Sequence, residues 1–332
     1  MELSRSREDS IIIGLTGDVM IGRMVEKKLS HTDPAYLWGD TLPLLRATDM
    51  NLINLEAALT FSEKAVFKTF NFKARPERVE ALVLASVDVA NLANNHCLDY
   101  SEEGLIETLD VLDKAGIRHV GAGNTISEAE KPIIVDVKGI KIGILGYTDN
   151  EPSWKATTHS PGTNYGTIRE EEAGTVGDAV RKLKQQVDFV LLTLHWGPNM
   201  RERPPEPFRN FAHRLIDSGV DIFHGHSAHI FQGVEIYDGK VIFYDTGDFV
   251  DDYYVDPFLR NDRSFFFLVE MIKERLLGIR LVPTLIGNCQ VNLATGIDRE
   301  ESTQRMILLS KEFDTELIVE KGNLIAKMFN EP

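Results

Sequence analysis

Long apolar runs and cysteines are both scarce in this sequence. Its two strongest apolar runs, IIIGL at 11–15 and FVLLTLHW at 189–196, fall far short of the roughly 20 residues that span a bilayer. The N-terminal stretch MELSRSREDS is polar and leads into no apolar signal core, so we expect neither a secretory signal nor a membrane anchor. Two cysteines, Cys97 and Cys289, are too few for a disulfide framework. These absences favour a cytoplasmic protein.

Positive charge is also in short supply. The 332 residues include 36 Lys and Arg against 51 Asp and Glu, which gives a net charge of −15. Nucleic-acid binders need a basic surface for the phosphate backbone, so we expect no nucleic-acid partner. Bound metal ions would supply the concentrated positive charge that an anionic ligand requires. Small molecules, peptides and anionic polymers stay open as substrates, and so does the oligomeric state.

The order of apolar runs predicts an α/β fold. Short apolar runs alternate with segments of helical period through about residue 225, which is typical of βαβ units in a parallel or mixed sheet flanked by helices. Expected strands cover 10–17, 50–56, 88–94, 119–124, 132–137, 141–147, 188–197 and 220–229. Expected helices cover 23–30, 41–48, 76–87, 101–116, 169–186 and 205–219, with a loop at 151–167.

Beyond residue 230 the pattern changes to antiparallel strands. Segment 233–248 predicts a hairpin that turns at Asp238-Gly239, because an Asp-Gly pair suits a two-residue turn. No internal repeat or low-complexity segment interrupts the chain, so one domain is the simplest organisation. The remaining expected elements are antiparallel strands at 264–295, a helix at 300–314 and a hairpin at 316–328.

Ligand-type side chains gather where the expected strands end. In an open α/β sheet the carboxyl ends of the strands border the ligand crevice, so these side chains should meet at one edge. Their mixture of carboxylate, carboxamide and imidazole suits a divalent ion such as Mn, Fe, Zn, Mg or Ca. The residues are Asp18, Asn54, Glu56, Asn95, His96, His195, His226 and His229.

Six stretches in this part of the chain follow the order of a known family. They are GDVMIGR (17–23), NLEAALT (54–60), NNHCLDY (94–100), LHWG (194–197), GHSAHIFQGVE (225–235) and YDTGDF (244–249). In this order they resemble the calcineurin-like metallophosphoesterases, and most closely the CapA-like branch, which is named for poly-γ-glutamate capsule biosynthesis. The resemblance implies a layered αββα sandwich of mixed sheets flanked by helices. We expect one domain over 1–332, with a motif core at 11–250 and a sheet-rich extension at 251–332.

The resemblance also implies a site with one or two divalent ions. Asp18 would bind one ion, and Glu56 would bridge two. The other implied metal ligands are Asn95, His195, His226 and His229.

Further roles are implied around these ligands. His96 would act as the catalytic histidine beside the metal, with Asp99 orienting it through one ring nitrogen. Arg23, typical of the capsule branch, would hold a carboxylate or phosphate through a bidentate fork. The expected substrate-binding residues are Arg23, Asn54, Asn94 and Trp196.

Three departures from the phosphoesterase pattern bear on the chemistry. Met20 stands two residues after Asp18, where those enzymes usually carry a histidine, and the bridging acid is Glu56 rather than an aspartate. The final pair is spaced Gly-His-x-x-His instead of Gly-His-x-His. These departures indicate that one metal site is weak or has a different geometry, so a single ion stays open beside two.

Several functions stay open at this point. The first is hydrolysis of a phosphoester or of a peptide- or amide-type anionic substrate by a metal-activated water. The alternatives are metal-dependent epimerisation of a peptide or amino acid, a role in making or handling poly-γ-glutamate capsule, and a binding module without catalysis. We expect His213 and His224 to be structural and Cys97 to be a small buried residue. Asp245 and Asp248 are either partners of the ligands or turn formers.

Overall fold

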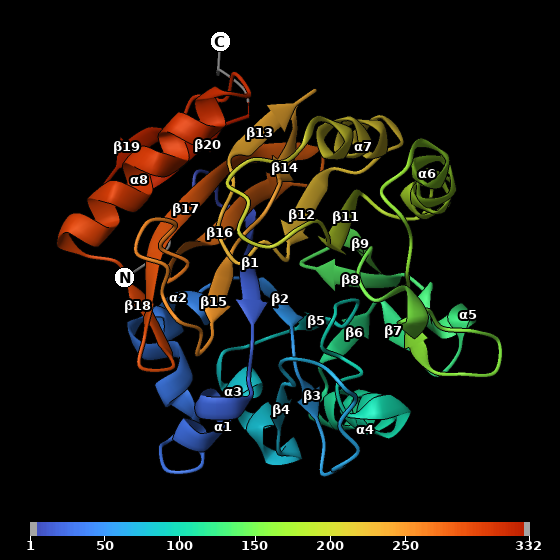
Figure 1. Ribbon diagram of the computed structural model, residues 1–332. Helices are drawn as coiled ribbons and strands as arrows, with labels where there is room; N and C mark the ends of the chain where they lie inside the picture. The colour runs from blue at the N-terminus through green and yellow to red at the C-terminus, as the bar shows by residue number, and fades with distance from the viewer. Residues whose placement is uncertain (1–4, 329–332) are drawn as a thin grey trace.

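Two mixed β-sheets packed face to face form the centre of the computed structural model (Figure 1). The structure describes residues 5–328, without the side chains of 170–172. The first sheet runs β19-β20-β17-β16-β1-β2-β5-β6, with β15 also paired to β1 and β18 to β17. Its strands are β1 (Ile11–Val19), β2 (Met50–Leu55), β5 (Val89–Asn91), β6 (Arg118–Val120), β15 (Asp248–Val250), β16 (Arg263–Ile272), β17 (Arg275–Gly287), β18 (Gln290–Leu293), β19 (Ile318–Glu320) and β20 (Asn323–Lys327).

The second sheet runs β13-β14-β12-β11-β9-β8. Two short strand pairs lie outside both sheets, β3 (Ala58–Leu59) with β4 (Lys73–Ala74) and β7 (Ala122–Gly123) with β10 (Gly162–Thr163). The strands of the second sheet are β8 (Ile133–Val137), β9 (Ile140–Thr148), β11 (Phe189–His195), β12 (Ile222–His226), β13 (Val234–Tyr237) and β14 (Lys240–Phe243).

Helices cover the outer face of each sheet. One apolar cluster joins the first sheet to α1, α3 and α4, and another joins the second sheet to α6 and α7. A third cluster fills the space between the sheets, with Ile13 and Phe267 on one side and Ile144 and Leu191 on the other. The expected mixed α/β sandwich is confirmed. The α-helices are α1 (Arg23–Leu29), α2 (Leu42–Leu45), α3 (Val79–Leu84), α4 (Ser101–Ala115), α5 (Ile126–Ala129), α6 (Glu170–Lys184), α7 (Glu206–Asp217) and α8 (Gly296–Lys311). The 3₁₀ helices are η1 (Pro34–Thr41), η2 (Pro76–Arg78) and η3 (Pro152–Trp154).

The C-terminal part of the chain extends the first sheet. β16 pairs antiparallel with β1, and β17, β18 and β20 continue outward from it. The predicted hairpin turn is confirmed, because Asp238 and Gly239 both have the positive φ that a two-residue turn needs. That residues 1–332 form one domain stays a prediction, and 1–4 and 329–332 lie outside the described residues.

Several expected elements differ from the structure. The helix at 41–48 is α-helical only over Leu42–Leu45, and the loop at 151–167 contains η3 and β10. The strand at 119–124 is broken at Gly121, which takes φ +83°. Glycine is needed there, because a Cβ would lie only 2.5 Å from the Cβ of Ala93. The expected helix at 76–87 consists of η2 followed by α3, which ends at Leu84, two residues before Ser86 adopts φ +54°. The helix at 300–314 begins four residues earlier, at Gly296.

Candidate functional site

Three neighbouring strands of the first sheet place polar side chains in one row. Asp18 on β1 is in register with Asn54 on β2 and with Asp248 on β15, and both pairings are parallel. All three side chains are fully buried. Asn54 Nδ2 donates a hydrogen bond to Asp18 Oδ1 at 2.8 Å. The carboxyl ends of these strands therefore form one side of a polar site, as expected for parallel strands.

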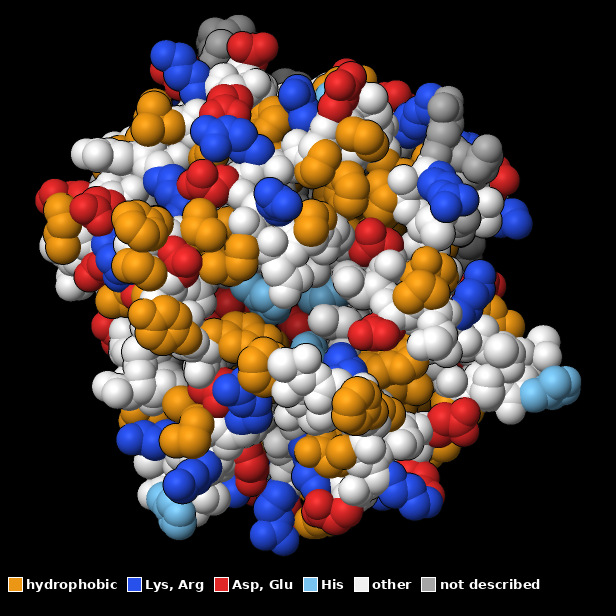
Figure 2. All heavy atoms as spheres, viewed as in Figure 1, with side chains coloured by type: hydrophobic (Ala, Val, Ile, Leu, Met, Phe, Trp, Pro, Cys, Tyr) orange, Lys and Arg blue, Asp and Glu red, His pale blue; other side chains and the backbone are white. Residues whose placement is uncertain are grey.

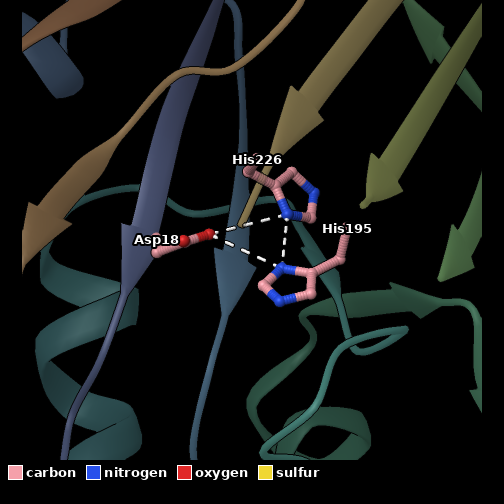
Figure 3. Close-up of side chains that lie close together, drawn as sticks. All are labelled: Asp18, His195 and His226. Carbon is pink, nitrogen blue, oxygen red and sulfur yellow. Dashed lines mark hydrogen bonds and ion pairs between the residues drawn. The ribbon is translucent and has the colours of Figure 1, made fainter. Parts of the chain in front are cut away.

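The second sheet brings two histidines to the same place (Figure 3). His195 ends β11 and His226 ends β12, in register with each other. Their Nδ1 atoms lie 2.9 Å apart, and 3.8 and 3.5 Å from Asp18 Oδ1. Thr193 Oγ1 lies 3.0 Å from His226 Nε2, so Nδ1 is the nitrogen left for the site. Asp18, His195 and His226 together are able to hold a metal ion.

A second group with the same ability shares Asp18 with the first. It consists of Asp18, Glu56 and His229, with His229 Nδ1 at 3.4 Å from Asp18 Oδ2. Glu56 Oε1 lies 4.0 Å from His195 Nε2, which links the two groups. The site therefore has donor atoms for one or two ions.

Several donor atoms of the site have no hydrogen-bond partner in the described structure. Buried polar atoms are normally paired, and an unpaired one destabilises the folded chain. A metal ion would coordinate these atoms, and its positive charge would balance that of the carboxylates. The unpaired atoms include Asp18 Oδ2, Glu56 Oε1, Asn95 Oδ1 and His195 Nε2.

The electrostatics of the site also suit a cation. Burial lowers the pKa of His195 to about 3 and that of His226 well below its usual value, so both rings are neutral, as metal binding requires. Burial and the charge of Asp18 raise the pKa of Glu56. Burial alone would lower the pKa of His229, but the nearby carboxylates of Asp248, Asp18 and Glu56 outweigh it and raise that pKa.

His96 and Asp99 form a pair beside these donors. His96 Nδ1 lies 2.6 Å from Asp99 Oδ2, and its Nε2 lies 3.6 Å from Glu56 Oε1. Lys68 Nζ and the Phe72 main-chain N–H also bind the Asp99 carboxylate, at 3.0 and 2.7 Å. Burial lowers the pKa of His96 in spite of Asp99. The ring is thus held neutral, with Nε2 on the side of the site.

Asn54 and Asn94, predicted to bind substrate, are buried and bonded to the protein. Asn94 Nδ2 donates to Asn54 Oδ1 at 3.1 Å and to the Leu55 carbonyl at 2.8 Å. Asn91 Nδ2 also donates to Asn54 Oδ1, at 2.9 Å. These amides fix the ends of β2 and β5, whereas the Asn95 side chain has an unpaired oxygen.

Trp196 and Arg23 have different surroundings. Trp196 is 3% exposed, its Nε1 donates to the Tyr244 carbonyl at 2.9 Å, and its ring packs against Phe208 and Phe223. This burial argues against the predicted contact between Trp196 and substrate. Arg23 is partly exposed and lies with its guanidinium carbon 4.7 Å from the Phe70 ring centre.

Sequence reasoning missed Lys68 and left Asp248 open. Asp248 Oδ1 lies 2.8 Å from His229 Nδ1, in the YDTGDF stretch that carries part of the resemblance. Nothing in the sequence signals that Lys68 reaches Asp99. His213 and His224 have structural contacts, because His213 stacks on Tyr237 and His224 bonds to the Thr16 carbonyl.

Residues 12–253 match the family described as "Bacterial capsule synthesis protein PGA_cap". The chain belongs to this family. Similar proteins include probable polyglutamine synthesis accessory proteins of two Mycobacterium tuberculosis strains, 31% identical with 96% of each chain covered. The PGA biosynthesis protein CapA of Bacillus subtilis is also 31% identical, over 74% of this chain and 64% of its own.

A solved structure, "Termus thermophilus Sulfate thiohydrolase SoxB in complex with glycerol", matches 94% of this chain and 62% of its own at 11% identity. Its TM-score is 0.43, and this distant likeness says nothing about function. Within residues 5–328, none of the helices combines the length and apolar character needed to cross a membrane.

Proposed function

We propose that this PGA_cap chain is a metal-dependent hydrolase whose substrate carries an anionic group near the bond that is cut. The observation that carries the proposal is the convergence of unpaired buried donor atoms of Asp18, Glu56 and His195 beside the His96–Asp99 pair. A divalent ion held by these groups would lower the pKa of a bound water towards about 7 and polarise a phosphoryl or acyl oxygen. Figure 2 is consistent with access to this site, because histidine side chains are visible at the floor of a hollow in the surface.

His96 is the residue proposed to move a proton. Asp99 Oδ2 accepts a hydrogen bond from His96 Nδ1–H, so the lone pair on Nε2 faces Glu56 and the candidate metal ligands. Nε2 would accept a proton from the attacking water and return it to the leaving group, a role worth about 10²–10⁴ in rate. Lys68 and the Phe72 main chain hold Asp99 in place, which keeps the His96 ring from turning away.

Arg23 is the residue proposed to bind the anionic group. Its guanidinium carbon lies 5.3 Å from the centre of the Phe72 ring, and that ring meets the His96 ring edge-on at 4.6 Å. Within the described residues its one ion pair joins Nε to Asp252 at 3.4 Å. The two terminal nitrogens are therefore oriented by neighbouring aromatic rings and available for a bidentate bond to a carboxylate or phosphate.

The relatives support a more specific candidate substrate. They are named for polyglutamine synthesis and for PGA biosynthesis. A γ-glutamyl polymer combines an amide bond with a nearby carboxylate, which suits the proposed roles of His96 and Arg23. A part in capsule-polymer metabolism is thus the second candidate, and the cytoplasmic location stays a prediction.

A substrate panel tests the proposal. Protein loaded with Mn²⁺ or Zn²⁺ is incubated with chromogenic phosphate esters, γ-glutamyl anilides and poly-γ-glutamate. We expect hydrolysis that a chelator abolishes and metal restores. His96→Ala should lower kcat by about 10²–10⁴ with metal content unchanged, while His213→Ala, which alters a histidine stacked on Tyr237, should keep full activity.

Failure of the metal-loaded protein to cleave any member of the panel would contradict hydrolysis. The same reactions in heavy water test the epimerase alternative, because exchange at Cα without hydrolysis would incorporate deuterium into recovered peptide. Shortening of poly-γ-glutamate chains, followed by mass spectrometry, distinguishes the capsule-polymer substrate from the phosphoesters.

A further inference from the structure

Asp248 lies directly beside the candidate metal ligands, and the main chain fixes it there. β15 is short, and its first residue pairs with Asp18 of β1. Asp18 N donates to the Gly247 carbonyl at 2.9 Å. Gly17 makes this approach possible, since a Cβ there would lie 1.8 Å from the Gly247 oxygen. The Asp248 carboxylate is therefore held at the edge of the site and is fully buried.

This carboxylate forms a hydrogen bond with one ring nitrogen of His229. Asp248 Oδ1 lies 2.8 Å from His229 Nδ1, closer than Asp18 Oδ2 at 3.4 Å. No hydrogen bond to His229 Nε2 is formed within residues 5–328. A neutral imidazole carries its proton on one nitrogen and a lone pair on the other, and its hydrogen-bond partner decides which. Asp248 accepts only, so in the neutral ring that would bind a metal ion the proton belongs on Nδ1 and the lone pair on Nε2.

The turn that carries His229 is held in an uncommon conformation. Ser227 has φ +118° and His229 has φ +59°, both outside the range that most side chains adopt. The Asp245 carboxylate binds the main-chain N–H groups of Ala228 and Gly247, each at 2.8 Å. Asp245 thereby ties the histidine turn to the segment that leads into Asp248. Asp245 therefore positions both His229 and Asp248 through hydrogen bonds to neighbouring main-chain groups.

We propose that Asp248 is a positioning residue of the metal centre, which fixes the tautomer of His229 so that Nε2 is its ligand atom. The proposal rests on the proposed function, because it needs an ion at the site. Groups that hold the second nitrogen of a metal-binding histidine fix its tautomer and ring orientation, and their loss typically weakens metal affinity about 10- to 100-fold. Asp248 would thus be required for tight binding through its bond to His229 rather than as a metal ligand itself.

Zinc binding to chelator-stripped protein tests this role. Isothermal titration should give Asp248→Ala an affinity about 10- to 100-fold below that of the unmodified chain. Asp248→Asn keeps an acceptor oxygen at the same position and should recover most of the loss. Asp221→Asn is the matched control, since Asp221 is a buried carboxylate that binds Lys184, Lys240 and the Val190 N–H at the other end of β12. Its zinc affinity should be unchanged.

The tautomer itself is visible by NMR of zinc-loaded protein labelled with ¹⁵N-histidine. We expect His229 to carry its proton on Nδ1 and to bind zinc through Nε2. Zinc bound to Nδ1 overturns the proposal. Because this measurement uses the unmodified chain, it does not depend on whether a variant folds. Equal affinity of the unmodified chain and Asp248→Ala overturns it and leaves the proposed function standing. Equal losses in Asp248→Asn and Asp248→Ala also overturn it, because charge would then matter and hydrogen bonding would not. An unmodified chain that binds no zinc overturns both.

Discussion

Replacing Glu56 by glutamine should change stability in opposite directions with and without metal. The Glu56 side chain is fully buried, its Oε1 has no hydrogen-bond partner, and burial together with the charge of Asp18 raises its pKa. Without metal the carboxylate is therefore unfavourable above its raised pKa. Removing its charge should stabilise the metal-free protein by about 1–3 kcal/mol, the usual scale for a buried unsatisfied group.

Metal reverses the order of stability. An ion that binds only the folded state stabilises it by about 4 kcal/mol at a concentration 1,000 times its Kd. Glu56→Gln removes one charged ligand, so the metal ion should stabilise this variant much less than the unmodified chain. With an unfolding entropy of about 2.1 cal/mol/K per residue, a chain of 332 residues should gain ~6 °C in Tm from 4 kcal/mol, against ~1–4 °C for the metal-free effect.

Thermal melts at mildly alkaline pH, in chelator and then in excess Mn²⁺, measure both effects. The variant should melt above the unmodified chain in chelator and below it in Mn²⁺. Two results would refute the reasoning. One is a metal-free variant that melts below the unmodified chain, and the other is an equal metal-induced shift in both proteins.

Three further predictions concern groups around the site. Burial raises the pKa of Asp149 to about 6 from 3.8, so the free energy of unfolding should fall as pH rises between those values. In urea titrations Asp149→Asn should reduce this dependence on pH, and an unchanged dependence would exclude Asp149 as its cause. Burial raises the pKa of the Cys97 thiol, so a thiol reagent should label Cys97 only after unfolding, and rapid labelling of the native protein at that thiol would count against its burial. Trp196→Ala should cost about 3–5 kcal/mol in urea unfolding with metal content unchanged in the folded fraction, and loss of metal would instead indicate a direct role in the site.

The sequence predicted the place of the candidate site because strand ends are visible in it. Asp18, Asn54, His195 and His226 each follow or end an apolar run, and parallel strands bring those ends together. The order of the motifs also predicted a sandwich of two sheets, which the structure confirms. The roles of the residues as ligands or catalysts stay predictions.

The partners of these residues could not be read from the sequence. Asp248 lies beside Asp18 because β15 pairs with β1, a contact between distant parts of the chain that no local pattern signals. Lys68 reaches Asp99 from a segment without regular secondary structure. Such long-range pairings depend on how the sheets and loops pack, so they appear only in the three-dimensional structure.

Trp196 is a case in which the sequence held a signal that the prediction did not use. Successive residues of a strand point to opposite faces of the sheet. His195 faces the site, so the next side chain should face the helices on the outer side, and Trp196 does pack there with Phe211 of α7. Alternation carried one residue beyond β11 therefore favours a core position for Trp196, and its predicted contact with substrate stays a prediction.

Elemental analysis of protein purified without chelator tests the central claim most directly. The account predicts one or two divalent ions per chain, with clear loss in Asp18→Ala and in His226→Ala, since Asp18 belongs to both candidate metal groups and His226 to one. His213→Ala should retain the full content. A folded, unmodified chain that carries no ion, and takes up none when Mn²⁺ or Zn²⁺ is supplied, would contradict the account.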